Sequence, residues 1–228
     1  MSAPSLSQLG PFGAKITSQN DEDGIIEKIF SVVAPQSKTF VEFGIGPNYQ
    51  DPQYEKGLEG NCVQLRAKGW KGIFLDGGVH PKKYDIRQEF ITPLNINSIL
   101  RKYKVSECDI LSIDVDGQDF WIWMAVSINP TLVIIEYNPN WFRLDQRKTV
   151  LFDPSFRWDG TKYYGASLGA LITLATDRGY TLVYANGVNA FFLRTIAIAN
   201  PHDFNPEKLN RVHDQHMPDH LQRPWVTV

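Results

Sequence analysis

A regular alternation of apolar runs with helical patterns is the feature that most limits how this chain can fold. Between residues 39 and 137, five short runs rich in branched and aromatic residues are separated by segments whose apolar residues recur at helical spacing. Two further runs follow a helical segment over 165–178, and Asn186-Gly187 between them is a strong hairpin signal. The predicted strands cover residues 39–43, 71–76, 89–92, 109–115, 131–137, 180–185 and 189–195.

Strands that alternate with helices predict a mainly parallel sheet with helices on both faces. Because the last two strands form a hairpin, the final strand runs antiparallel. We therefore predict an α/β fold with three layers and a Rossmann-like seven-stranded sheet, mainly parallel, with a C-terminal antiparallel hairpin strand. A single domain is expected to span residues 1–228, with a lead-in over 1–17, a core over 18–195, a substrate loop over 138–164 and a surface tail over 197–228.

Composition limits the partners. The formal net charge is -2, which gives no overall basic field for nucleic acid or an anionic membrane. The sequence shows no apolar run of signal-peptide or transmembrane character, and Cys62 and Cys108 form no CxxC motif. We expect a soluble cytoplasmic protein with buried thiols and with neither a nucleic acid nor a membrane as partner. The oligomeric state is not readable.

Carboxylates and glycines follow four of the predicted strands at the point where each strand ends. In an open α/β sheet, ligands bind outside these carboxyl ends. A carboxylate after the second strand can accept hydrogen bonds from both hydroxyls of a ribose, which predicts that Asp76 binds a nucleoside. The Gly44-x-Gly46 turn lacks a GxGxxG helix start, so it suits an amino-acid-bearing nucleoside better than a pyrophosphate. The residues at the strand ends are Glu42, Gly44, Gly46, Asp76, Gly77, Asp114, Asp116, Glu136 and Asn138.

The segment Leu111-Ser-Ile-Asp-Val-Asp-Gly-Gln-Asp119 resembles the Ile-Asp-Val-Glu-Gly signature of the FkbM-like methyltransferases, with Asp116 in place of the usual Glu. Segments 18–27, 133–138 and 163–168 resemble the same group. The resemblance implies the class I S-adenosylmethionine-dependent methyltransferase fold, which has seven strands, the last of them antiparallel. It also implies methyl transfer to a hydroxyl of a sugar, polysaccharide or small natural product, so the expected partner is a small-molecule or glycan acceptor.

The resemblance further implies a cofactor site built from eight residues. Asn48 stands where a third glycine occurs in the common Gly-x-Gly-x-Gly turn, which leaves the binding of the methionine end open. The expected cofactor-binding residues are Glu42, Gly44, Gly46, Asn48, Asp76, Gly77, Asp114 and Asp116.

A second resemblance concerns mechanism. In cation-dependent catechol-type O-methyltransferases, acidic and amide residues after the fourth and fifth strands hold magnesium, and Asp114, Glu136 and Asn138 occupy similar places. Oxygen ligands suit a hard cation, which lowers the pKa of a bound hydroxyl. Alternatively, Asp114 orients the cofactor amine while the other two hydrogen-bond to loops. The expected catalytic residues are Asp114, Glu136 and Tyr164, although core packing is equally open for Tyr164.

Three other functions stay open. N-methylation of a small molecule or protein would use the same fold, and a non-catalytic S-adenosylmethionine-binding module would look the same in sequence. A nicotinamide enzyme is disfavoured because the GxGxxG motif is missing and the chain ends in a hairpin.

Overall fold

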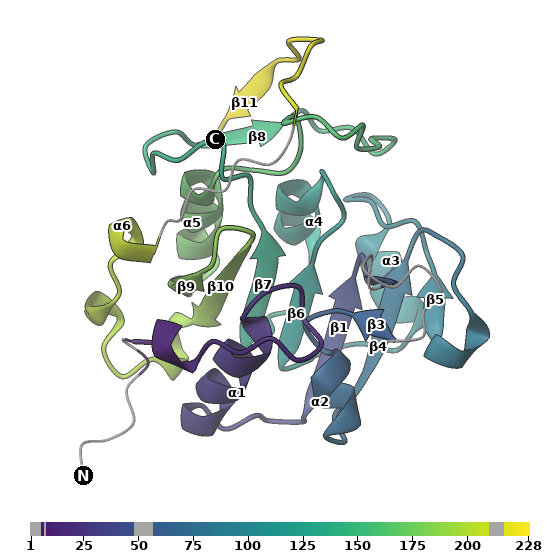
Figure 1. Ribbon diagram of the computed structural model, residues 1–228, viewed down its shortest axis with the longest axis vertical. Helices are drawn as coiled ribbons and strands as arrows, with labels where there is room; N and C mark the ends of the chain where they lie inside the picture. Colours follow the sequence, from purple (N-terminus) through teal and green to yellow (C-terminus); the bar gives the residue numbers. More distant parts are fainter. Residues whose placement is uncertain (1–5, 7, 48–56, 210–216) are drawn as a thin grey trace.

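The computed structural model describes residue 6 and residues 8–47, 57–209 and 217–228. Its centre is a seven-stranded sheet in the order β5-β4-β1-β6-β7-β10-β9 (Figure 1). The strands are β1 (Thr39–Phe43), β4 (Lys71–Asp76), β5 (Ile86–Gln88), β6 (Ile110–Ile113), β7 (Leu132–Glu136), β9 (Tyr180–Ala185) and β10 (Asn189–Arg194).

Strand direction confirms the predicted sheet. The strands β5, β4, β1, β6 and β7 run parallel to one another. The last strand, β10, is antiparallel to both of its neighbours and lies between β7 and β9. The hairpin therefore inserts its second strand into the sheet and leaves its first strand, β9, at the edge.

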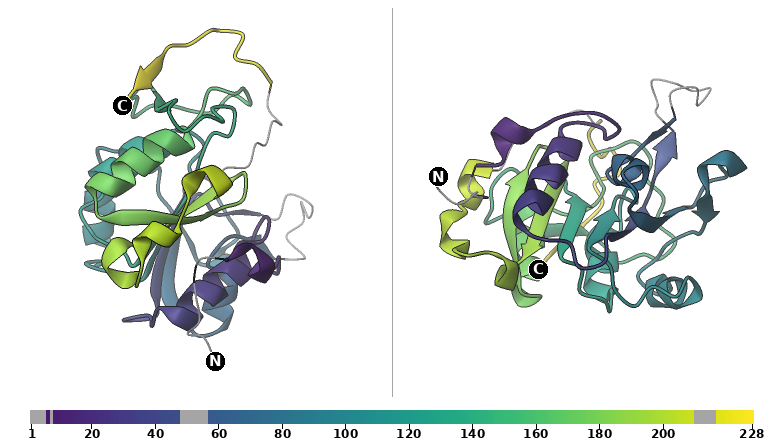
Figure 2. Two further views of the ribbon diagram at one scale, coloured as in Figure 1. Left: turned by 90° about the vertical axis from the view of Figure 1, so that its left-hand side faces the viewer. Right: turned by 90° about the horizontal axis from the view of Figure 1, so that it is seen from below.

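Helices cover both faces of the sheet, which gives the three predicted layers. Successive strand residues point to opposite faces, so Phe40 packs into one core cluster and Val41 into the other. Figure 2 shows α1 and α5 on opposite sides of the sheet. One face carries α1 (Glu22–Val32) and α2 (Val63–Ala67), and the other carries α3 (Ile96–Lys102), α4 (Asp119–Ala125) and α5 (Leu168–Asp177).

The predicted third strand over 89–92 is wrong, because the edge strand is Ile86–Gln88 instead. The reason is the side chain of Asn95, whose Oδ1 accepts a hydrogen bond from the Thr92 backbone N–H at 2.8 Å and whose Nδ2 donates to the Phe90 carbonyl at 2.8 Å. These two bonds hold the segment as a turn rather than as an extended strand. The following helix consequently begins at Ile96, three residues after Pro93.

The segment 138–164 is partly ordered by the C-terminal tail. Strand β8 (Lys148–Val150) pairs antiparallel with β11 (Trp225–Thr227), and the pair lies above the sheet in Figure 1. The Tyr163 hydroxyl donates to the Pro224 carbonyl at 2.9 Å and accepts from the Leu151 N–H at 3.1 Å. The tail therefore anchors this segment instead of only wrapping the surface.

Short elements complete the chain. No helix within the described ranges is long and apolar enough to cross a bilayer. The short elements are the pair β2 (Gly46–Pro47) and β3 (Leu58–Glu59), the helix α6 (Pro206–Leu209), and 3-10 turns at Gly10–Phe12, Lys82–Tyr84, Thr195–Ala197 and Pro201–Asp203.

Candidate functional site

The order of the strands changes direction between β1 and β6. After β1 the chain moves outward to β4 and β5, and then returns to the other side of β1 with β6. The crevice outside the carboxyl ends of β1 and β6 is therefore the expected ligand site in a sheet of this kind.

Gly44 makes this junction possible. Its φ is +74°, and a Cβ atom at this position would lie 1.3 Å from the carbonyl oxygen of Asp114. Only glycine lets the end of β1 approach the end of β6 so closely while its N–H donates to the Leu75 carbonyl at 2.9 Å. The sequence signal of the Gly-x-Gly turn thus has a definite structural cause.

Two adjoining pockets open at the junction and share Gly44, Gly46, Asp114 and Asp116. The Asp76 pocket spans about 760 Å³ and the Glu136 pocket about 1140 Å³, and part of each volume is open to solvent. Beyond the shared residues, the Asp76 pocket includes Asp76, Gly77, His80, Phe90, Gln118 and Phe156. The Glu136 pocket includes Gln19, Glu42, Glu136, Trp158, Tyr164 and Asn189.

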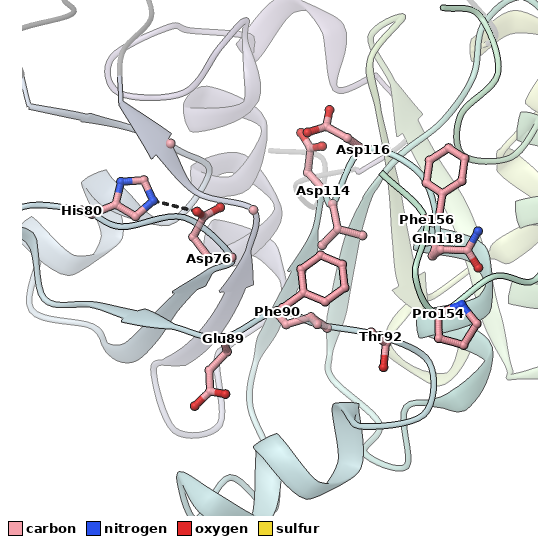
Figure 3. Close-up of a pocket in the computed structure, with 15 residues that line it drawn as sticks. Asp76, His80, Glu89, Phe90, Thr92, Asp114, Asp116, Gln118, Pro154 and Phe156 are labelled. Carbon is pink, nitrogen blue, oxygen red and sulfur yellow. Dashed lines mark hydrogen bonds and ion pairs between the residues drawn. The ribbon is translucent and has the colours of Figure 1, made fainter. Parts of the chain in front are cut away.

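Asp76 lies on one side of its pocket, facing Asp114 and Asp116 across the cavity (Figure 3). Asp76 Oδ1 accepts from the Gly78 N–H at 2.6 Å and lies 2.7 Å from His80 Nε2. Both contacts use the same carboxylate oxygen, so Oδ2 is left for a ligand. From the sequence, a surface-loop position is favoured for His80, but its ring lines the pocket and fixes the carboxylate.

Aromatic side chains form the remaining wall of the Asp76 pocket. In Figure 3, the Phe90 ring lies below Asp114, and Phe156 lies beside Gln118. The Arg157 guanidinium stacks on the Phe90 ring, 3.3 Å from its centroid. A Cβ atom on Gly117 would lie 2.2 Å from the Phe156 ring. This glycine therefore allows segment 138–164 to lie over the end of β6.

The shared carboxylates have strongly perturbed protonation. Burial raises the pKa of Asp114 well above its usual range, and the negative charge of Asp116 adds to the effect. Burial, followed by the charge of Asp114, does the same to the pKa of Glu136. Asp116 is the most exposed of the three, and partial desolvation together with the charge of Asp119 raises its pKa to about 6. The three shifts follow first from the loss of water around these carboxylates and then from their mutual repulsion.

Among the described residues that line the two pockets there is no lysine or arginine. A ligand that carries positive charge would therefore lower the free energy of the ionised carboxylates, and an anionic ligand would raise it.

Glu42 lines the Glu136 pocket, but both of its carboxylate oxygens accept backbone hydrogen bonds. Oε1 accepts from the Asn61 N–H at 2.6 Å and Oε2 from the Cys62 N–H at 3.0 Å. Burial outweighs these bonds and raises the pKa of Glu42 to about 7. Glu42 thus holds the segment before α2 against the pocket, and this structural task takes both oxygens expected for the cofactor.

Asn138 does not join the acidic residues, contrary to its predicted place in a metal site. Its Nδ2 donates to the carbonyls of Lys162 and Tyr164 at 2.8 and 2.9 Å, and its Oδ1 accepts from the Asn140 N–H at 3.0 Å. The buried Asn138 amide thus holds the two ends of segment 138–164 together.

Asp119, which is not among the expected ligands, lies beside two residues that are. One ligand oxygen each from Asp114, Asp119 and Glu136 lie within 4.8 Å of one another. Both Asp119 oxygens already accept backbone hydrogen bonds, from Val115 at 2.8 Å and Gly117 at 2.9 Å. Magnesium binding therefore stays a prediction, with an altered ligand set.

Tyr164 lies in the wall of the Glu136 pocket. Burial and then the charge of Glu136 raise its pKa far above 10. The phenol therefore stays protonated at neutral pH and is suited to hydrogen bonding rather than to proton abstraction. Its ring meets that of Trp158 edge-on with the centroids 5.7 Å apart.

The remaining predicted residues divide by location. Gly46, Gly77, Asp76, Asp114 and Asp116 all line the pockets, and Asn48 lies outside the described residues. Sequence reasoning missed Asn189 as a site residue. Its signal is its place at the start of the last strand, which becomes informative only when that strand is known to pair with β7.

No protein-family model matches this chain, and a comparison with curated proteins found no match. The functional argument therefore depends on the geometry and the electrostatics of the two pockets.

Proposed function

We propose that the protein is an S-adenosylmethionine-dependent methyltransferase that transfers the methyl group to oxygen. The observation that carries the proposal is the cleft at the β1–β6 junction, where acidic side chains surround two joined pockets without a lysine or arginine among the described lining residues. S-adenosylmethionine supplies a methyl group on a positively charged sulfur and also bears an ammonium group, which complements such a cleft. The seven-stranded sheet with its antiparallel last strand is consistent with this assignment.

The residues present fit this cofactor. Asp76 Oδ2 is placed to accept hydrogen bonds from ribose hydroxyls, while His80 and Gly78 fix the other oxygen. Gly44 presents backbone without a side chain where the two pockets meet. Asp114 and Asp116 would bind the amino group and offset the charge on sulfur. Phe90 offers an apolar ring for the base.

The residues of the Glu136 pocket would bind the acceptor. Alignment of the acceptor oxygen with the methyl group is the main requirement of an in-line displacement. The substrate loop contributes Phe156 to one pocket and Trp158 to the other, so it limits the access of water to both. Asp114 and Glu136 bring carboxylate oxygens within 4.8 Å of each other, and one of these two carboxylates would take the proton that a hydroxyl must lose.

The same features disfavour a dinucleotide. A pyrophosphate is anionic, and in this cleft it would meet Asp76, Asp114 and Asp116 with no lining lysine or arginine among the described residues. Helix N-terminal glycine motifs of the GxGxxG type are likewise missing from the sequence.

The test is isothermal titration with S-adenosylmethionine, S-adenosylhomocysteine and NAD. We expect both sulfur nucleosides to bind and NAD not to bind. Asp76→Asn should weaken S-adenosylhomocysteine binding by about 10- to 100-fold, which corresponds to about 1–3 kcal/mol for a lost hydrogen-bond acceptor. The matched control is Asp177→Asn at the exposed end of α5, which should bind like the wild type. Binding of NAD alone, or equal binding by the Asp76 variant, would contradict the proposal.

A further inference from the structure

Two buried oxygen atoms in the Glu136 pocket have no hydrogen-bond donor among the residues that the structure describes. They are Oε2 of Glu136 and Oδ1 of Asn189. The two residues are directly opposite each other in the antiparallel pair of β7 and β10, so their side chains leave the same face of the sheet. A buried acceptor without a donor destabilises the folded protein, and two of them side by side indicate a ligand that supplies the donors.

The orientation of the Asn189 amide is fixed by a neighbour. Asn189 Nδ2 donates to Glu22 Oε1 at 3.0 Å, and a rotated amide would turn its oxygen against this carboxylate. The Asn189 side chain is buried, with 3% of it exposed. Because its Nδ2 donates to Glu22, the atom left for the pocket is the acceptor Oδ1. Glu22 accepts hydrogen bonds from the Asn20 backbone N–H and from Asn186 Nδ2. These bonds give a structural role to part of segment 18–27, which the cofactor site leaves without one.

The charge around these two acceptors favours a cation. Asp114 has an oxygen within 4.8 Å of one from Glu136, and the same pocket has no lysine or arginine among its described lining residues. The rings of Trp158 and Tyr164 also line it, and aromatic faces attract cations. A primary ammonium group combines positive charge with three donors, whereas a sugar hydroxyl brings one donor and no charge.

We propose that the methyl acceptor carries a primary amino group, bound in its protonated form by Glu136 Oε2, Asn189 Oδ1 and the aromatic pair. This inference rests on the proposed function, because it treats the occupant of the pocket as the acceptor. It narrows the acceptors from hydroxyl compounds in general to amino-bearing ones, such as amino sugars and amino alcohols. The amino group serves as an anchor that directs a hydroxyl of the same molecule toward the shared residues at the end of β6.

The test measures binding of matched probes to the full chain by saturation-transfer NMR, with and without saturating S-adenosylhomocysteine. The probes are glucosamine and 2-aminoethanol, each compared with its N-acetyl derivative. We expect the free amines to bind at least tenfold more tightly than their acetylated forms when S-adenosylhomocysteine is present. Glu136→Gln should remove this preference, while the exposed control Glu107→Gln at the opposite end of β6 should keep it.

The outcomes separate this inference from the proposed function. If S-adenosylhomocysteine binds and neither amine is preferred over its acetylated form, the anchor is overturned and the methyltransferase proposal stands. If the amines are preferred but S-adenosylhomocysteine does not bind, the acceptor role is overturned together with the proposed function. If magnesium binds to the wild type and excludes the amines, the pocket is a metal site and the anchor is again overturned. Asn189→Leu serves as a second variant, with circular dichroism to verify that it folds, and should also remove the preference.

Discussion

Two aspartates at opposite ends of strand β6 have pKa values shifted in opposite directions. Asp109, which precedes the strand, accepts hydrogen bonds from the backbone N–H groups of Gln36 and Ser37 at 2.7 and 2.9 Å. Burial alone would raise its pKa, but these bonds outweigh burial and the pKa is lowered. For Asp114, which follows the strand, burial and then the charges of neighbouring carboxylates raise the pKa well above the usual range.

We infer from this difference that a carboxylate is a functional candidate when the fold supplies it with few hydrogen-bond donors. Asp23 supports the same rule, because it accepts from the N–H groups of Ile16, Thr17 and Ser18 at 2.6–2.8 Å and holds the lead-in to α1. The structural carboxylates Asp109 and Asp23 are supplied with donors by the fold. Near the β1–β6 junction, Glu136 Oε2 has no donor among the described residues, which is consistent with a ligand that supplies one.

The largest loss of stability is expected from a substitution of Gly44, which allows the ends of β1 and β6 to lie close together. Gly44→Ala should destabilise the fold by at least about 4 kcal/mol, because its Cβ would overlap the Asp114 carbonyl. Gly69→Ala is the control, since Gly69 has a similar φ of +85° but open space around the added atom. It should cost only about 1–2 kcal/mol. Urea unfolding measures both, and similar losses for the two variants would refute the close approach.

Asn138 tests whether a residue beside the acidic set is structural. Asn138→Ala removes the donors to the Lys162 and Tyr164 carbonyls and should cost about 3 kcal/mol. The exposed control Asn200→Ala should change the free energy of unfolding by less than about 0.5 kcal/mol. Thermal unfolding followed by circular dichroism gives both values. A stable Asn138→Ala protein would argue against a structural role and return Asn138 to the candidate metal ligands.

Stability should depend on pH in the direction set by Glu42, because the cost of burying this carboxylate outweighs its two backbone hydrogen bonds and raises its pKa. A carboxyl group with a raised folded-state pKa stabilises the fold below its unfolded value, and this stabilisation is lost as the pH rises through the folded value. For Glu42 the window runs from 4.5 to about 7. The free energy of unfolding should therefore fall by about 2–3 kcal/mol between pH 5 and pH 7.5. Urea unfolding across this range checks the slope, and a rise in stability would contradict it.

The contrast itself is tested by two matched substitutions. Asp109→Asn should cost about 2 kcal/mol, because an amide nitrogen would face N–H groups that now donate to a carboxylate. Asp114→Asn should leave the free energy of unfolding unchanged or raise it by about 1 kcal/mol, because it removes a repelled charge. Equal destabilisation by both variants at pH 7 would show that the two ends of β6 do not differ as described.

Much of the fold could be predicted from the sequence because the strong apolar runs determine it. The limits of β1, β4 and β9 agree with the predicted ones. Asn186-Gly187 correctly predicted the hairpin of β9 and β10. The weak edge strand could not be located, since the side chain of Asn95 decides where the chain turns. The spacing of apolar residues does not predict a hydrogen bond between a side chain and the backbone.

The candidate site was less predictable. Strand ends identified Asp76, Asp114 and Glu136 as residues of one cleft, since parallel strands end at the same edge. Asn189 escaped notice because its position depends on the insertion of β10 beside β7. The role of Asn138 likewise depends on contacts with residues more than twenty positions away.

The most direct measurement of the central claim is the number of protons released on binding, obtained by calorimetry in buffers of different ionisation enthalpy. S-adenosylmethionine and S-adenosylhomocysteine would be compared at pH 6.5, because they differ in the positive charge on sulfur and in the methyl group that creates it. If the acidic cleft binds a positively charged ligand, binding of S-adenosylmethionine should release more protons than binding of S-adenosylhomocysteine. The reason is that the positive charge on sulfur favours the ionised form of the carboxyl groups at the strand ends. Equal proton release by the two compounds, or no binding of either, would contradict the account.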